Sequence, residues 1–338
     1  MNIAIEWIDA LEQFGYTARE AEFLYIVAAH SGFFLQRQFM TFVNVSGRGP
    51  ATYFLKKAIQ KQHVREHRPE RGTQKIYHLF SRDIYAAIKK ENSRNRKPGR
   101  YGLLEKAAVR VLGLDFVLGH LDYQYLEEER DKVSYFIDAK GVAKEALPAK
   151  IFRGQDGTET RRYFVENFPI FVPVRVLPTV ANLTYIEDEI RSLRTFASFI
   201  ERYQPLFTAL DRNFKLIFVS NSTRSFQSAR EIFVSLLSGA RQVKEQGQLA
   251  RFFWLRKMAE EKRFKDLAHK DVIDWQRGLK QYSNSSYEGQ YQNWKQTGKA
   301  PEIERSAVVS NPSDQFETFL ILPRLGRLGL SADEADAQ

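Results

Sequence analysis

The basic residues at positions 37–100 are the side chains of this sequence whose type and spacing most directly indicate a chemistry. This stretch holds sixteen lysines and arginines against four acidic residues, an excess of about +12, whereas the whole chain carries +10. The rest of the chain is therefore slightly acidic. Because neutralised phosphates release counterions and this release drives association, such a local excess predicts binding to a polyanion. We expect double-stranded DNA as the partner.

The helix that would position this charge is predicted to span residues 50–62. Gly49 can cap it, and Pro50 is tolerated in the first turn because its missing N–H would be unpaired there. An apolar stripe follows at i, i+3, i+4, i+7 and i+8, made by Ala51, Phe54, Leu55, Ala58 and Ile59. Successive residues of an α-helix are about 100° apart around its axis, so the polar side chains of this segment point away from the apolar stripe. The predicted groove-contacting residues are Arg48, Thr52, Tyr53, Lys56, Lys57 and Gln60.

The elements around this helix predict a winged helix-turn-helix. Thr17 and Glu20 fit a capping box that opens a helix ending near His30. A short second helix is expected at 35–43. Two strands, at 64–69 and 75–80, flank a polar hairpin at 70–74 that contains a glycine. The wing residues expected to hold phosphates are Arg68, Arg71 and Lys75. The alternative is a protein-docking module whose charged helix is merely solvated.

Two further segments extend this interpretation. The basic run at 89–100 is interrupted by asparagine, serine, proline and glycine, and is typical of a linker, with or without contacts to a DNA backbone. A helix at 3–14 is a candidate for homodimerisation, which would impose a two-fold-related DNA site. The resulting domain prediction is 1–90 for the DNA-binding domain, 91–101 for a basic linker, 102–330 for a mixed α/β domain and 331–338 for an acidic tail.

The order of a capped helix at 17–29, a basic third helix at 50–62, a hairpin and a long mixed region resembles the replication-relaxation family of plasmid and integrative-element proteins. The resemblance covers most of the chain. It implies a winged-helix DNA-binding protein encoded on mobile DNA, with a second domain similar to a degenerate restriction-endonuclease fold. We therefore expect a transcriptional regulator or a replication or transfer accessory factor.

Beyond the basic segment, the pattern predicts alternating helices and strands. Helices are expected at 101–121, 125–137, 191–210 and 225–237, and strands at 150–152, 163–165, 170–176, 181–186, 214–220 and 316–322. This order favours an α/β or α+β layered structure. A charge-rich helical region follows at 242–281, whose aromatic residues could contact a protein partner or pack on their own domain, and residues 282–298 are predicted to be a loop.

Acidic residues near predicted strand ends are candidates for a second chemistry. A nuclease of the restriction type holds Mg²⁺ with acids at adjacent strand ends and needs a nearby lysine at the scissile phosphate. The weak candidates are Glu166, Glu187 and Glu189. The family pattern places a lysine two positions after an acid, but Phe168 follows Glu166 and Glu189 follows Glu187. Acids that open a helix also stabilise its dipole. We therefore expect an inactive scaffold rather than an enzyme.

The amino-acid composition excludes several other kinds of functional site. The chain has no cysteine and six histidines, so disulfides, thiolate metal sites and cysteine nucleophiles are excluded. His63 and His67 have metal-ligand spacing only in a helix, and no third ligand lies nearby in the sequence. We expect no metal and no cofactor. Without an apolar run of about 20 residues or a basic-then-apolar N-terminus, we also expect a cytoplasmic protein without a membrane partner.

Overall fold

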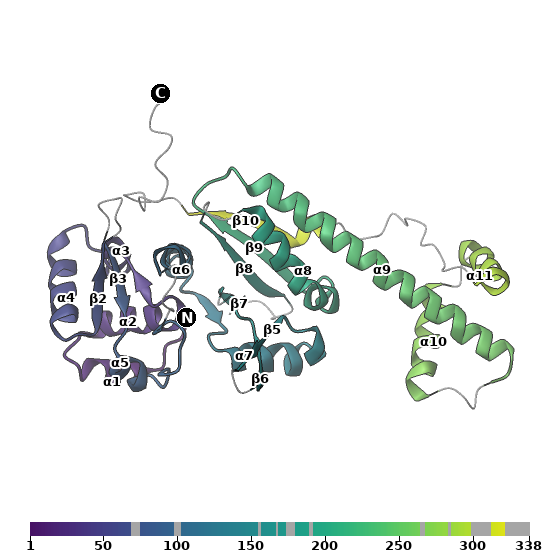
Figure 1. The fold of residues 1–338 in the computed structure, drawn as a ribbon, viewed down its shortest axis with the longest axis horizontal. Coiled ribbons are helices and arrows are strands. Elements are labelled where there is room, and N and C mark those ends of the chain that lie inside the picture. Colours follow the sequence, from purple (N-terminus) through teal and green to yellow (C-terminus); the bar gives the residue numbers. More distant parts are fainter. Residues whose placement is uncertain are drawn as a thin grey trace, which may run out of the picture. The chain divides into compact units, whose positions relative to one another are not determined.

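The computed structural model describes residues 1–68, 75–97, 103–154, 157–166, 168–173, 180–188, 192–263, 268–282, 285–298 and 312–321 (Figure 1). They belong to two compact units, one of residues 1–230 with the described residues from 315 onward, the other of residues 231–314. Helices and several sheets are both present, so the fold is α+β as expected. The predicted boundary at 91–101 falls inside the first unit, and the predicted domain limits stay a prediction.

The N-terminal part of the first unit combines five helices with a small sheet. Its elements are α1 (Ile5–Glu12), α2 (Ala18–His30), β1 (Phe33–Phe34), α3 (Gln36–Val43), α4 (Arg48–Gln60), β2 (Val64–His67), β3 (Ile76–Leu79) and α5 (Arg82–Ala87). The sheet is antiparallel, with β3 between β1 and β2. The predicted capping box is confirmed, because the Glu20 amide N–H donates to Thr17 Oγ1 and the Thr17 amide N–H donates to Glu20 Oε2.

Aromatic side chains form the core that holds α4. Phe54 is fully buried and stacks on Phe39, with ring centroids 4.2 Å apart. Phe23 lies edge-on to Phe39 and to Phe34, at 5.1 and 5.3 Å. The predicted stripe of α4 is buried except at Ile59, which is 39% exposed. Ile59 lies about 90° from the centre of the stripe, so it falls outside the core contact.

The rest of the first unit is built on a second sheet. Its strands are β4 (Tyr123–Tyr125), β7 (Ile170–Pro173), β8 (Ala181–Glu187), β9 (Phe214–Ser220) and β10 (Phe316–Leu320), in the order β10-β9-β8-β7-β4. β8, β9 and β10 are parallel, whereas β7 is antiparallel to both of its neighbours (Figure 1). A separate hairpin is formed by β5 (Ala149–Arg153) and β6 (Glu159–Tyr163).

Helices cover both faces of this sheet. On one face, Phe196 of α8 (Leu193–Leu210) packs edge-on against Tyr185 and Phe218. On the other, Phe116 of α6 (Leu103–Leu118) contacts Phe171 and Phe319. Side chains alternate between the faces along each strand, which is how neighbouring strands serve both helices.

α6 also packs against the N-terminal part. Ala107 and Val111 belong to a buried cluster with Phe33, Leu35 and Ile76. Almost every described position of α6 from Ala107 to Val117 is buried, so the helix is apolar on all sides rather than on the single face that its pattern predicts.

Residues 91–97 pack against the N-terminal helices. Asn95 is 1% exposed, and its Nδ2 donates to the Ala28 and Ala29 carbonyls at 2.9 and 3.0 Å. Gly32 has φ +77°, and a Cβ there would lie 2.3 Å from the Asn95 carbonyl oxygen, so only glycine fits. Residues 91–97 of the predicted linker are therefore packed within the first unit, while 98–101 lie outside the described residues.

The second unit is helical and lies in the chain between β9 and β10. It contains the part of α9 (Phe226–Glu260) from residue 231, with α10 (His269–Gln281) and α11 (Ser285–Thr297). Phe252 and Phe253 are buried with Tyr282 and Tyr291. Gly278 permits close approach of α10 to α9, since a Cβ there would lie 2.2 Å from the Phe252 ring.

Three sequence-based predictions of secondary structure need correction. The predicted loop at 282–298 is wrong, because α11 spans most of it. Tyr287, Tyr291 and Trp294, at i, i+4 and i+7, give this polar segment an inward stripe. The helix predicted at 125–137 begins later than expected, because residues up to Tyr125 belong to β4. It consists of α7 (Glu129–Ser134) followed by a π-helix at Tyr135–Ala139. The predicted strand at 163–165 ends at Tyr163 as β6.

We predict that Phe54→Ala destabilises the fold by about 3–5 kcal/mol, because it empties the centre of the aromatic cluster. The adjacent Tyr53 is 69% exposed, so Tyr53→Ala should change the free energy of unfolding by only about 0.5 kcal/mol. Urea denaturation followed by circular dichroism measures both. Equal losses from the two variants would contradict this assignment of core and surface.

Candidate nucleic-acid interface

The exposed face of α4 carries most of the predicted groove-contacting residues. Thr52, Tyr53, Lys56 and Gln60 are all exposed, as the helical periodicity predicts. The helix begins at Arg48, with Gly47 as its N-cap, two residues earlier than expected. Arg48 therefore lies in the first turn of α4 and is also exposed. The buried stripe of the same helix fixes this face toward solvent.

Lys56 is a cation that this part of the fold leaves unpaired. Its side chain is exposed and makes no ion pair with any described residue, and the same holds for Arg48 and Lys61. Lys61 was not among the predicted contacts, although it is the third lysine of the same helix region. Together they provide positive charge near Tyr53 and Gln60, whose side chains can stack or hydrogen-bond.

Lys57 does not belong to this face. Its Nζ is hydrogen-bonded to Glu20 Oε2 and donates to the Gly15 carbonyl at 3.1 Å. The Lys57 and Glu20 side chains are only 14% and 10% exposed. The ammonium also lies 4.9 Å from the centroid of the Tyr16 ring. This lysine ties α4 to the capping box of α2, and its predicted contact with DNA stays a prediction.

The wing strands carry an acid that the sequence interpretation overlooked. Glu66 on β2 pairs with Arg68 at 2.8 Å and with Lys75 at 3.0 Å. Burial opposes ionisation, but the hydrogen bonds from both cations outweigh it and hold the pKa of Glu66 below its usual value. Such exposed pairs contribute about 0–1 kcal/mol, so a phosphate can compete for either cation. Arg71 lies outside the described residues.

Several other cations of the basic segment are bound within the protein. Arg37 makes two hydrogen bonds to Asp115, at 2.7 and 2.6 Å. Lys90 pairs with Glu127 at 2.9 Å, and Arg94 donates to the Val165 carbonyl at 3.2 Å. The excess counted along the sequence therefore overstates the charge available to a partner, because the neutralising groups lie far away in the chain.

The acidic candidates do not form a metal-binding cluster among the described residues. Glu166 is bonded to Arg202, accepts from the Tyr203 hydroxyl at 3.2 Å and lies 3.7 Å from Lys150 Nζ. Glu187 is 1% exposed at the end of β8, opposite Ser220 of β9. Glu189 lies outside the described residues. The carboxylate of Glu166 is thus engaged by cations of its own chain.

The paired histidines have structural surroundings. The Tyr16 hydroxyl is 2.8 Å from His63 Nδ1, and burial lowers the pKa of His63. Burial likewise lowers the pKa of His67, which lies on β2. His63 directly precedes β2 and His67 is its last residue, so the length of the strand separates the two rings too far to chelate one ion.

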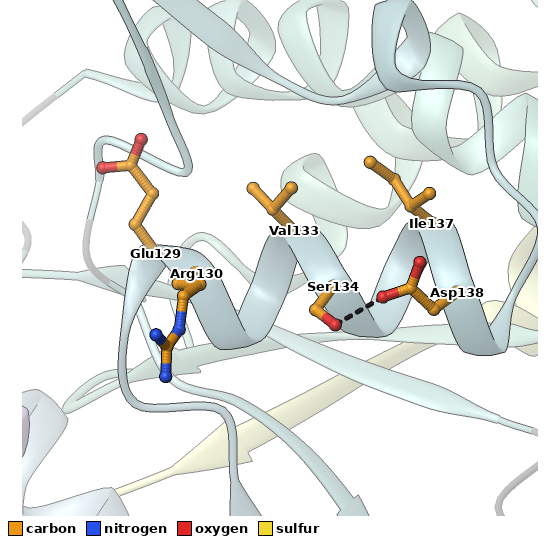
Figure 2. A pocket seen from close by; sticks show the side chains of 6 residues that line it. All are labelled: Glu129, Arg130, Val133, Ser134, Ile137 and Asp138. Atoms are coloured by element: carbon orange, nitrogen blue, oxygen red, sulfur yellow. Dashed lines mark hydrogen bonds between the residues drawn. The ribbon is translucent and has the colours of Figure 1, made fainter.

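A shallow hollow of about 540 Å³ runs along α7 and the π-helix after it (Figure 2). Figure 2 shows its lining side chains on successive turns of one helical segment, with the Ser134 hydroxyl donating to Asp138 at 2.5 Å. Among the described residues that line it, none is a histidine or lysine that could activate this serine.

No protein-family model, no curated protein and no solved structure matches this chain. The resemblance to the replication-relaxation family therefore stays a prediction. Across the described residues, no helix combines the length and apolar character needed to cross a membrane.

We predict that Lys57→Met destabilises the protein by about 1–3 kcal/mol, because it leaves Glu20 without its cation in a mostly buried position. The neighbouring Lys56→Met removes the same charge from an exposed position and should change stability by about 0.5 kcal/mol or less. Urea denaturation compares the two. A Lys56→Met protein that is the less stable of the pair would reverse the assignment.

Proposed function

We propose that this protein binds double-stranded DNA through the exposed face of α4, with the β2–β3 hairpin alongside. The observation that carries the proposal is the division of α4 into two faces. Its apolar stripe is buried on Phe23, Phe34 and Phe39, while Tyr53, Lys56 and Gln60 are exposed on the opposite side. A helix held this firmly from behind can enter a major groove without rearrangement.

The order of elements supports the same proposal. Helix α2, strand β1, helices α3 and α4 and strands β2 and β3 follow one another, and β3 lies between β1 and β2. This order supports our proposal of a winged helix-turn-helix, a fold in which the third helix reads bases and the hairpin contacts the backbone. Here α4 takes the place of that third helix.

The chemistry of the face suits a duplex. Gln60 can form two hydrogen bonds to adenine in the major groove, and Lys56 can contact guanine or a phosphate. Arg68 and Lys75 can exchange their exposed pairing with Glu66 for contacts to phosphates. Base contacts would come from α4 and backbone contacts from the hairpin.

In this proposal the protein is a transcriptional regulator or a replication or transfer accessory factor of a mobile element. We expect no catalytic role for Glu166, because its carboxylate is already engaged by Arg202 and Lys150. A homodimer would present two α4 helices to a two-fold site. Helix α1 has little apolar surface left for such contact, since Ile8 and Leu11 are buried in their own chain and Ile5 remains exposed.

We predict that Lys56→Met weakens binding to duplex DNA about tenfold and lowers the salt dependence by about one counterion, because one phosphate or base contact is lost. Fluorescence anisotropy of a labelled duplex from the protein's own genetic locus, titrated at several salt concentrations, measures both quantities. The matched control is Lys270→Met, which removes an exposed lysine on α10 and should leave affinity unchanged.

Two results would contradict the proposal. The first is a wild-type protein that binds no duplex at low salt, which would favour a protein-docking role. The second is an equal loss of affinity in both variants, which would place the interface elsewhere. Running the same duplex on a gel after incubation with Mg²⁺ tests cleavage separately, and the proposal expects intact DNA.

A further inference from the structure

A cavity of about 330 Å³ lies within the first unit, away from α4. It is lined by Ala29 and by residues 89–95, 127–130, 132 and 162–164. Its size is at the lower end of the range for small-molecule sites in proteins. Six cationic and four anionic side chains line it, which makes it more charged than a typical ligand pocket.

The carboxylates of this cavity are largely engaged. Lys90 Nζ lies 2.9 Å from Glu127 and 3.1 Å from Glu128. Glu129 pairs with Arg162 at 2.8 Å and with Arg94 at 3.6 Å. Three of the four lining acids are therefore neutralised by three of the six lining cations. The net charge of the remaining lining side chains is positive.

Lys132 is the exceptional group among the remaining cations. It lines the cavity and is only 4% exposed, yet its ammonium makes no hydrogen bond or ion pair with any described residue. Burial lowers its pKa to about 8 even though the carboxylates of Asp131, Glu129 and Glu127 act to raise it, so at neutral pH most molecules still carry the charge. Arg130, exposed at the same cavity, also has no ion pair with a described residue.

A buried ammonium without a direct hydrogen-bonded partner is costly, and groups whose pKa is shifted by burial cluster at functional sites. An anion in the cavity would supply the missing partner of Lys132. Arg130 and Lys89 would add charge, and Ser93 and Asn92 are polar side chains of the same lining. With two or more cations available, a phosphate group fits this lining better than a singly charged carboxylate.

We propose that this cavity is a binding site for a small ligand that carries a phosphate group, with Lys132 as its buried anchor. The site is distinct from the DNA-binding face and does not depend on it. Free phosphate and a phosphate monoester share this chemistry, and they are distinguished by testing both.

The test measures the melting temperature of the full chain while inorganic phosphate or glycerol 3-phosphate is titrated against chloride at matched ionic strength. The variant is Lys132→Met, with Lys270→Met as the control for loss of a lysine elsewhere. We expect both ligands to raise the melting temperature of wild type and of Lys270→Met, and neither to raise that of Lys132→Met. A larger rise with glycerol 3-phosphate would identify a monoester as the ligand class.

The ligand-free proteins provide an independent comparison. Removing an unpaired buried charge should raise the melting temperature of Lys132→Met above that of wild type. Arg130→Met, a change at an exposed position, should fold normally and show a smaller phosphate-dependent rise. The proposal is overturned if wild type gains nothing from either ligand, if Lys132→Met gains as much as wild type, or if Lys132→Met melts at a lower temperature without ligand.

Discussion

Burial of α6 between two sheets is the constraint on which the first unit depends. On one side Ala107 and Val111 pack with Phe33 and Ile76, and on the other Phe116 packs against the second sheet. Polar contacts fix the helix further, because Gln38 Nε2 donates to the Val111 carbonyl at 2.8 Å and Arg37 holds Asp115. The helix that presents the proposed DNA-binding face is thereby joined through a shared core to the second sheet. A ligand bound near Lys132 would occupy this same compact unit.

The lysines at 56 and 57 show how the fold separates two uses of one residue type. Lys56 points away from the buried stripe of α4 and has no ion pair with a described residue, whereas Lys57 is drawn into the capping box of α2. A lysine that is paired inside the protein still counts as a cation in the sequence, but it no longer contributes to the positive charge of the surface. The surface potential of the N-terminal part is therefore set by which cations have internal partners, such as Glu20 and Asp115, more than by their number.

Local patterns predicted much of this fold, and long-range contacts account for the rest. The capping box at Thr17, the amphipathic character of α4 and the strands β8 and β9 follow from spacing and residue type, and the structure contains them. The pairing of Lys57 with Glu20 joins residues 37 positions apart, which no local pattern reveals. The anchoring of Asn95 depends in the same way on tertiary packing. The polar composition of residues 282–298 led to the wrong prediction of a loop. Three aromatic residues at helical spacing in this segment instead pack inward, and it forms α11.

The central claim, that α4 is the DNA-binding face, is tested most directly by lysine acetylation of the full chain with and without saturating duplex, read by mass spectrometry. The account predicts that DNA protects Lys56, that Lys57 reacts slowly in both states because it is bonded to Glu20, and that Lys270 reacts equally in both. A Lys56 that reacts at the same rate in free and DNA-bound protein would contradict the account.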